Sequence, residues 1–244
     1  MRNARTLTIA ILLAVLAPAT AARADGPSAN PAGMTRLSDE HTLSRWAYPS
    51  NFAKIRSRPT GQARTVARLR WHTEDRLPEI YLVLASWADG HGNTWVKIRV
   101  PKRPNGVTGW VPRGALRDFN VVREFLDIDR SRLRATLFRS GRPILSVRIG
   151  IGTRSNPTPK GRFYIREKFR VSGAPIYGPY AIGTSAYAPR LTDWPGGGVV
   201  GLHGTNQPGL IPGRPSHGCI RLRNANITRL YRLAPRGTPI RIHD

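Results

Sequence analysis

The chain of 244 residues has a single cysteine, Cys219, and only 14 acidic residues. One cysteine excludes an intramolecular disulfide framework and a cysteine-rich zinc fold. After the N-terminal segment, no apolar run approaches the roughly 20 residues that cross a bilayer. A Gly-X-Y period is also missing, which excludes collagen. The 40% hydrophobic and 22% charged content is that of an ordinary globular protein, with room for one large domain or two small ones.

Because acidic residues are scarce, the chain is strongly basic. It has 39 lysines and arginines and a formal net charge of +25. Such a charge bears on partners and not on the fold. Nucleic acid, an anionic membrane surface and an anionic polymer are the candidate partners. A solvated arginine-rich surface without a specific partner is the alternative.

The N-terminal segment indicates export. Arg2 and Arg5 precede an apolar run over residues 7–19, and Ala22-Arg23-Ala24 follows as a small-x-small cleavage pattern. These three parts predict a secretory signal peptide in residues 1–24, with an uncleaved N-terminal anchor as the alternative. We therefore expect a soluble exported protein in the periplasm or cell wall. Export argues against nucleic acid as a partner and favours anionic envelope polymers or the membrane surface.

Two β-rich regions are predicted after a flexible linker over residues 25–43, which is rich in Gly, Pro, Ser and Asn. In residues 44–118, short β-branched and aromatic runs alternate with turn signals. The predicted strands are 53–57, 65–69, 80–85, 95–100 and 109–111. Five short strands in this length predict a small β-barrel.

The landmarks of this region are Ile55-Arg56-Ser57-Arg58-Pro59, then Trp95-Val96-Lys97-Ile98, then Gly109-Trp110-Val111-Pro112. In this order they resemble bacterial SH3-like domains. The resemblance implies a barrel of a kind that often binds wall peptides in exported proteins. The tryptophans of the region form either a ligand surface or a small core, and core packing is the favoured interpretation. They are Trp71, Trp87, Trp95 and Trp110.

Residues 119–244 are predicted to form a second, mainly β domain. Apolar residues alternate over 133–137 and 145–151 around Ser140-Gly141, as in a hairpin with one buried face. Further strands are expected at 163–169, 198–202 and 240–242. Asn224 is expected to cap a short helix that carries Ile227, Leu230, Tyr231 and Ala234 on one face.

The candidate catalytic residues are His203 and those of the segment Ser216-His217-Gly218-Cys219-Ile220-Arg221. An imidazolium beside a thiolate is a common way to make a nucleophile at neutral pH. Gly218 would allow a tight turn, so that the amides of Gly218 and Cys219 donate to an oxyanion. One alternative is a buried structural cysteine. Another is a zinc site of His203, His217 and Cys219, but the H-x-C spacing is unusual for zinc, so no metal and no cofactor are expected.

This segment, together with Asn156-Pro157-Thr158-Pro159-Lys160-Gly161-Arg162-Phe163, resembles the L,D-transpeptidase catalytic domain of the YkuD family over about residues 120–244. The resemblance implies that Cys219 is the nucleophile and His203 the proton donor and acceptor. It implies that the carbonyl of Gly204 orients the His203 ring. It also implies a site lined by Ser216, His217 and Arg221, with Arg221 holding a substrate carboxylate. Tyr177 and Tyr180 either cover the substrate or pack on the sheet.

The implied reaction is peptidoglycan cross-linking. Cys219 would attack the amide between the third residue of a stem tetrapeptide and its terminal D-Ala, which leaves behind a thioester. The side-chain amine of a neighbouring stem would then form a 3-3 cross-link. Peptidoglycan stem peptides are therefore the expected partners. The alternatives are an L,D-carboxypeptidase, in which water takes the acyl group, and a non-catalytic wall-binding protein.

Overall fold

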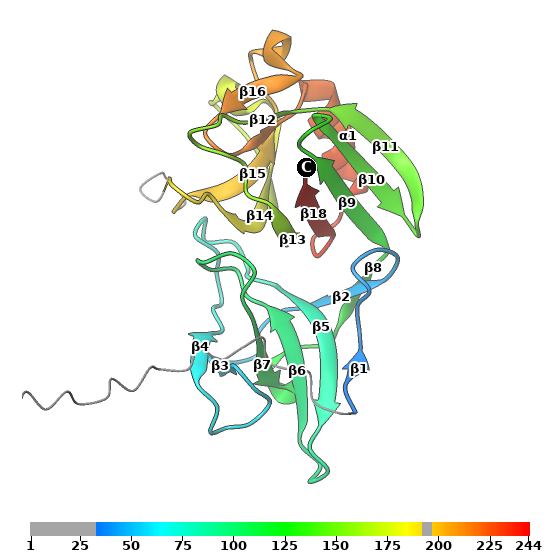
Figure 1. Cartoon of the computed structure of the whole chain (residues 1–244), viewed down its shortest axis with the longest axis vertical. Coiled ribbons are helices and arrows are strands. Elements are labelled where there is room, and N and C mark those ends of the chain that lie inside the picture. The colour runs from blue at the N-terminus through cyan, green and yellow to red at the C-terminus, as the bar shows by residue number, and fades with distance from the viewer. Residues whose placement is uncertain (1–32, 192–196) are drawn as a thin grey trace, which may run out of the picture.

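The computed structural model describes residues 33–191 and 197–244, and these form two halves stacked along the longest axis of the molecule (Figure 1). The N-terminal half comprises residues 33–122 and the C-terminal half residues 124–244. The predicted signal peptide and the first part of the predicted linker lie outside the described residues. Within the described ranges, no helix combines the length and apolarity that crossing a membrane requires.

The N-terminal half is built on an eight-stranded sheet with the order β4-β3-β7-β6-β5-β2-β8, in which β1 also pairs with β5. A 3-10 turn, Arg113–Ala115, follows β7. The strands are β1 (Thr35–Arg36), β2 (Ser44–Ala47), β3 (Lys54–Arg56), β4 (Thr65–Arg68), β5 (Tyr81–Ala88), β6 (Thr94–Arg99), β7 (Thr108–Pro112) and β8 (Asn120–Val122).

All five strands expected in this half are present, as β3 to β7, each shifted by no more than three residues at either end. The structure adds β1, β2 and β8. Strand β1 falls in the predicted linker, so the chain is already part of the first sheet from Thr35 onward. Strand β8 pairs with β2, so residues 120–122 are also part of the first sheet.

The tryptophans of the N-terminal half differ in burial. Trp110 is 2% exposed and lies in the interior of the half, whereas Trp71, Trp87 and Trp95 are half-buried. Trp87 and Trp95 are opposite each other on β5 and β6, and Trp71 packs edge-on against Phe52. Trp110 is therefore a core residue. The SH3-like character of this half stays a prediction.

The C-terminal half is built on a ten-stranded sheet with the order β11-β10-β9-β18-β13-β14-β15-β17-β12-β16. One α-helix, α1 (Asn224–Leu233), packs on β14 and β15. The strands are β9 (Glu124–Asp129), β10 (Arg134–Arg139), β11 (Arg142–Arg148), β12 (Gly150–Gly152), β13 (Gly161–Arg170), β14 (Tyr180–Tyr187), β15 (Val199–His203), β16 (Gly213–Ser216), β17 (Ile220–Arg221) and β18 (Pro239–His243). The prediction of a mainly β fold with a short helix is confirmed.

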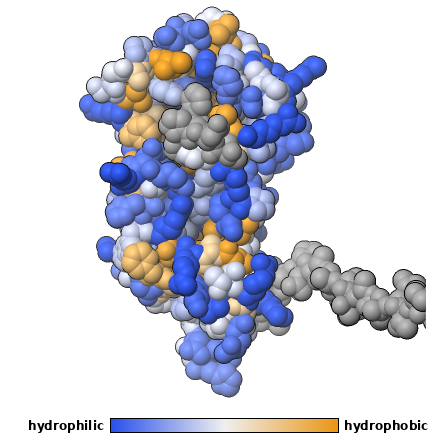
Figure 2. All heavy atoms as spheres, turned by 90° about the vertical axis from the view of Figure 1, so that its left-hand side faces the viewer, coloured by the Kyte–Doolittle hydropathy of each residue, from blue (hydrophilic) through white to orange (hydrophobic). Residues whose placement is uncertain are grey.

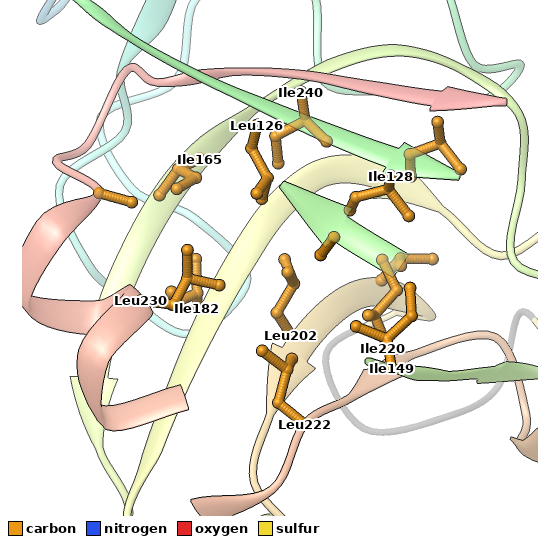
Figure 3. Close-up of a cluster of buried hydrophobic side chains, with 14 of the residues drawn as sticks. Leu126, Ile128, Ile149, Ile165, Ile182, Leu202, Ile220, Leu222, Leu230 and Ile240 are labelled. Atoms are coloured by element: carbon orange, nitrogen blue, oxygen red, sulfur yellow. The ribbon is translucent and has the colours of Figure 1, made fainter. Parts of the chain in front are cut away.

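The core of the C-terminal half lies between the strands of this sheet and α1. Side chains from β9, β13, β14, β15, β17 and β18 meet there, together with Leu230 of the helix (Figure 3). Most of them are Ile and Leu, and Leu126, Ile182 and Leu202 are completely buried. The buried leucine and isoleucine side chains fix which face of each strand points inward, and therefore which residues lie on the opposite face.

Helix α1 begins as predicted, but Asn224 does not cap it. Arg223 is the residue at the cap position and makes no side-chain capping bond. The Oδ1 atom of Asn224 instead accepts a hydrogen bond from the amide of Thr205 at 2.9 Å. The side chain therefore ties the helix to the loop after β15 instead of satisfying the helix's own amides.

The two halves are joined by polar contacts that are largely buried. The Tyr164 hydroxyl donates to the carbonyl of Ile80 at 2.8 Å, and Arg166 of β13 forms a buried ion pair with Glu79. Asn105 exchanges two hydrogen bonds with the backbone of Tyr187, at 2.8 and 2.9 Å. Strands β13 and β14, which carry these partners, lie at the end of the C-terminal half that faces the N-terminal half (Figure 1).

Candidate active site

The fold brings His203 and Cys219 together through two neighbouring parallel strands. His203 is the last residue of β15, and Cys219 immediately precedes β17. The register pairs Leu202 with Ile220, and both of these side chains are buried in the core. Because side chains alternate along a strand, His203 and Cys219 lie on the opposite face, away from the core.

His203 is held in a defined orientation. Its side chain is buried, and Nδ1 lies 2.7 Å from the carbonyl oxygen of Gly204. Since a carbonyl can only accept, Nδ1 carries the proton of the neutral ring and Nε2 is left as the acceptor. The ring of Tyr177 meets the imidazole edge-on, with centroids 4.9 Å apart. The orienting carbonyl is the one that the family resemblance implied.

Both reactive groups favour their neutral forms. Burial lowers the pKa of His203 to about 4, and the positive charge of Arg221 acts in the same direction. Burial also raises the pKa of the Cys219 thiol, although the Gly201 amide donates to Sγ at 3.5 Å and Arg221 favours the thiolate. This differs from the expected thiolate–imidazolium pair, because a buried site penalises both charges.

Two hydroxyl groups hold the loop that carries Cys219. Ser216 Oγ donates to the carbonyl of Cys219 at 2.5 Å and accepts from the amide of Gly218 at 3.2 Å. Thr158 Oγ1 donates to the carbonyl of Gly218 at 2.8 Å and accepts from the amide of Gly152 at 2.9 Å. Gly218 has a φ of 123°, a conformation that L side chains rarely adopt. The predicted turn is thus present, with the Gly218 amide engaged by Ser216 in the free protein.

Two cavities meet at the cysteine. The first has a volume of about 150 Å³ and is lined by Ile176, Ala188, Val200, Ser216, His217 and Arg221. The second has a volume of about 380 Å³ and is lined by Asp75, Glu167, Phe169, Arg170, Ala181 and Gly183. Tyr177, Val199, His203 and Cys219 line both. Cys219 therefore lies where the two cavities meet.

Of the residues expected to bind substrate, Ser216, His217, Arg221 and Tyr177 line the first cavity. The buried Nε atom of Arg221 has no hydrogen-bond partner among the described residues, while Nη1 donates to Gln207 at 3.3 Å. An anion entering the cavity would satisfy that nitrogen. Tyr180 is different: its ring stacks on Tyr231 with centroids 4.4 Å apart, and it lines neither cavity.

Several residues of the site were not expected from the sequence. Thr158 lies in a motif that was recognised, but its position in the chain gave no sign that it supports the cysteine loop. The sequence predicts Asn224 as a helix cap and not as the partner of the Thr205 amide. Asp75 and Glu167 come from different halves of the molecule, so no local spacing connects them. In the part of the chain that the structure describes, no group of three or more His, Cys, Asp or Glu residues is placed to hold a metal ion.

The C-terminal half is similar in sequence to known proteins. Residues 123–242 match the family model described as the L,D-transpeptidase catalytic domain, YkuD. The YkuD protein of Bacillus subtilis, named as an L,D-transpeptidase, is 32% identical over 108 residues, which are 44% of this chain and 58% of that protein. The ErfK/SrfK protein of Salmonella typhimurium, named likewise, is 29% identical over 143 residues, 51% of this chain and 46% of that protein. The chain thus spans about half the length of the curated relatives it matches.

Solved structures of proteins named L,D-transpeptidase are also similar to this chain. The L,D-transpeptidase from Mycobacterium smegmatis shares 14% identity with a TM-score of 0.42, covering 81% of this chain and 99% of that one. A mutant Enterococcus faecium L,D-transpeptidase shares 17% identity with a TM-score of 0.42, covering 80% and 75%. The family model and the curated relatives together support a YkuD-type L,D-transpeptidase catalytic domain in residues 123–242 of this chain.

Proposed function

We propose that this protein is an exported peptidoglycan L,D-transpeptidase that forms 3-3 cross-links through a thioester on Cys219. The observation that carries the proposal is the position of Cys219, beside an oriented His203 and between two cavities. An acyl transfer needs a donor on one side of the nucleophile and an acceptor on the other. A second cavity favours transfer to an acceptor over hydrolysis by water alone.

The first half of the reaction forms the acyl-enzyme. The Cys219 thiol transfers its proton to Nε2 of His203 as Sγ attacks the carbonyl carbon before the terminal D-Ala. The C–N bond then breaks, and His203 returns the proton to the departing amine of D-Ala. Because both residues begin neutral, proton transfer accompanies the attack and the products are a thioester and free D-Ala.

The second half of the reaction forms the cross-link. An amine from a neighbouring stem attacks the thioester carbon, and the C–S bond breaks. His203 passes the amine proton to the sulfur, which restores the thiol. In the first cavity, Arg221 would hold a carboxylate of the donor stem through its unpartnered Nε.

The proposal also includes the location of the protein in the cell envelope. Hydrophilic side chains cover most of one face of both halves (Figure 2), and the sequence is strongly basic. This charge would hold an exported protein near anionic wall polymers or lipid headgroups through attraction that salt weakens. The SH3-like interpretation of the N-terminal half, with wall peptides as its ligand, belongs to the same proposal.

The test is intact-mass spectrometry of residues 25–244 incubated with a carbapenem, an acylating agent that the family resemblance implies. We expect one adduct on the unmodified sequence, none on Cys219→Ala and a slower reaction of His203→Ala. Incubation with a tetrapeptide should then give cross-linked dimers. Tripeptides alone would indicate a carboxypeptidase, and no adduct on the folded protein would contradict an acylatable cysteine.

A further inference from the structure

The second cavity contains a buried carboxylate that the reaction described above does not use. Glu167 is 1% exposed, and its Oε2 accepts a hydrogen bond from Thr73 of the N-terminal half at 2.5 Å. Its Oε1 is also buried and has no hydrogen-bond partner among the described residues. A buried carboxylate oxygen without a donor is costly unless a ligand or water supplies one.

This carboxylate lies on the same face of the sheet as Cys219, and only glycines separate them. The register pairs Glu167 with Gly183 on β14 and Gly183 with Gly201 on β15. The amide of Gly201 in turn donates to Cys219 Sγ at 3.5 Å. Residues directly opposite each other on neighbouring strands present the same face. A strip of sheet without side chains therefore runs from the carboxylate to the sulfur.

The geometry at Gly183 places the carboxylate above this strip. A Cβ atom at Gly183 would lie 2.4 Å from Glu167 Oε1, so the carboxylate occupies the space that a side chain would fill. Opposite residues of an antiparallel pair are about 4.5–5.5 Å apart. A nitrogen bound to the carboxylate above Gly183 would thus be close to the sulfur beside Gly201.

The charges that face this position come from both halves of the molecule. Asp75, from the N-terminal half, lines the same cavity and adds a second negative charge. Arg166 is adjacent in sequence, but its guanidinium is bound to Glu79 and Glu74. Arg170 also lines the cavity and lies over the Tyr180 ring. When Glu167 is ionised, two carboxylates and one arginine leave the cavity with a net negative charge, in a protein that is otherwise strongly basic.

We propose that Glu167 and Asp75 bind the primary ammonium group of the acceptor and so make this transferase selective for a cationic amine. The inference rests on the proposed function, because it assigns the second cavity to the acceptor of the same reaction. It also gives the N-terminal half a direct part in the site, since that half supplies Asp75 and the hydroxyl that holds Glu167. The acceptor's ammonium would donate to the free Oε1 and pass one proton to this carboxylate, which leaves the neutral amine to attack the thioester.

The test separates acceptor use from acylation. The full chain is incubated with a donor tetrapeptide and either a tripeptide with a free side-chain amine or hydroxylamine, which is largely uncharged at pH 7.5. Glu167→Gln and Asp75→Asn are compared with the control Asp118→Asn, whose carboxylate is fully exposed in the N-terminal half. Asp75 is exposed at the edge of the cavity, so Asp75→Asn keeps the test valid if Glu167→Gln fails to fold.

For the cationic acceptor, we expect Glu167→Gln and Asp75→Asn to lower the ratio of transfer to acylation about tenfold or more, the loss typical of a charge-assisted hydrogen bond. For hydroxylamine, the ratio should change much less, and Asp118→Asn should behave as the unmodified sequence does. An unchanged ratio, or an equal loss with both nucleophiles, would overturn the inference. If the tetrapeptide fails to acylate Cys219 at all, the proposed function itself is wrong, which intact mass reports separately.

Discussion

The guanidinium of Arg166 lies against the carboxylate of Glu79, with Nε 3.0 Å from Oε1, and neither side chain has any exposed surface. Arg166 belongs to the strand that borders the site, whereas Glu79 belongs to the other half of the molecule. Glu74 and Arg70 extend the cluster, with N–O distances of 3.0 Å. The position of one half on the other is therefore tied to a buried charge network.

Glu79→Gln should destabilise the protein by about 3–5 kcal/mol, because it leaves part of the Arg166 charge uncompensated in the interior. Urea unfolding followed by circular dichroism would measure the change. The matched control is Lys160→Met, which breaks the exposed Lys160–Asp244 pair and should have a much smaller effect, because solvent screens an exposed ion pair. Equal effects of the two substitutions would show that burial of the pair is energetically unimportant.

The rate of carbapenem acylation should stay level as the pH falls from 7 towards 5. It should then decrease about tenfold per pH unit once His203 becomes protonated, since its base form is required and burial lowers its pKa to about 4. Stopped-flow measurement of the acylation rate would record the profile. A rate that already falls between pH 7 and 6 would indicate a histidine with an ordinary pKa.

Tyr177→Ala should slow acylation about two- to tenfold, because an edge-on aromatic pair contributes roughly 0.5–1.5 kcal/mol and here restrains the His203 ring. Tyr177→Phe keeps the ring and serves as the control. If the phenylalanine variant loses as much activity as the alanine variant, the hydroxyl and not the ring contact is responsible.

Thr158→Val keeps the shape of the side chain but removes the hydroxyl that bridges Gly152 and Gly218. Two buried backbone groups lose their partner, at about 1–3 kcal/mol each. We expect a lower midpoint of thermal unfolding together with slower acylation, because the cysteine loop loses its support. A stable variant with unchanged acylation would mean that the strand pairing alone holds the loop.

Burial and the negative charge of Asp75 raise the pKa of Glu167 to about 7. The hydrogen bond from Thr73 and the positive charge of Arg166 lower this pKa but do not outweigh the increase. A carboxyl group with a raised folded-state pKa stabilises the fold at low pH, and this stabilisation is lost as the pH rises from about 4.5 through 7. The unfolding midpoint of the unmodified protein should therefore fall between pH 5 and 8 by more than that of Glu167→Gln. Parallel curves for the two proteins would contradict the raised pKa.

The strands that the sequence predicted are those whose bulky residues alternate or cluster, such as 95–100 and 145–151. Strand β14 was not predicted, although it lies at the centre of the site, because Ala, Gly, Thr and Ser dominate its sequence and carry no hydrophobic period. A strand that leaves space for substrate has few large side chains. The same lack of large side chains removes the hydrophobic alternation from which a strand is predicted.

The sequence identifies the candidate nucleophile because one short motif contains Cys219 and its preceding Ser-His-Gly. His203 lies outside this motif and follows from the family resemblance that the motif carries. The acidic pair in the second cavity could not be found in this way, since Asp75 and Glu167 are 92 residues apart and meet only when the two halves dock. The neutral state of His203 and Cys219 likewise depends on burial, which sequence spacing does not report.

Strand β13 has a β-bulge between Ile165 and Glu167, opposite Thr184 and Gly183. The extra residue directs two consecutive charged side chains, Arg166 and Glu167, towards the N-terminal half while Ile165 remains in the core. Deletion of one residue here would restore strict alternation, leave the pairing of all later residues with β14 unchanged, and keep only one of the two charged side chains on this face. A chain one residue shorter at this point would thus lose either the buried partner of Glu79 or the proposed acceptor carboxylate, even with the cysteine and histidine unchanged.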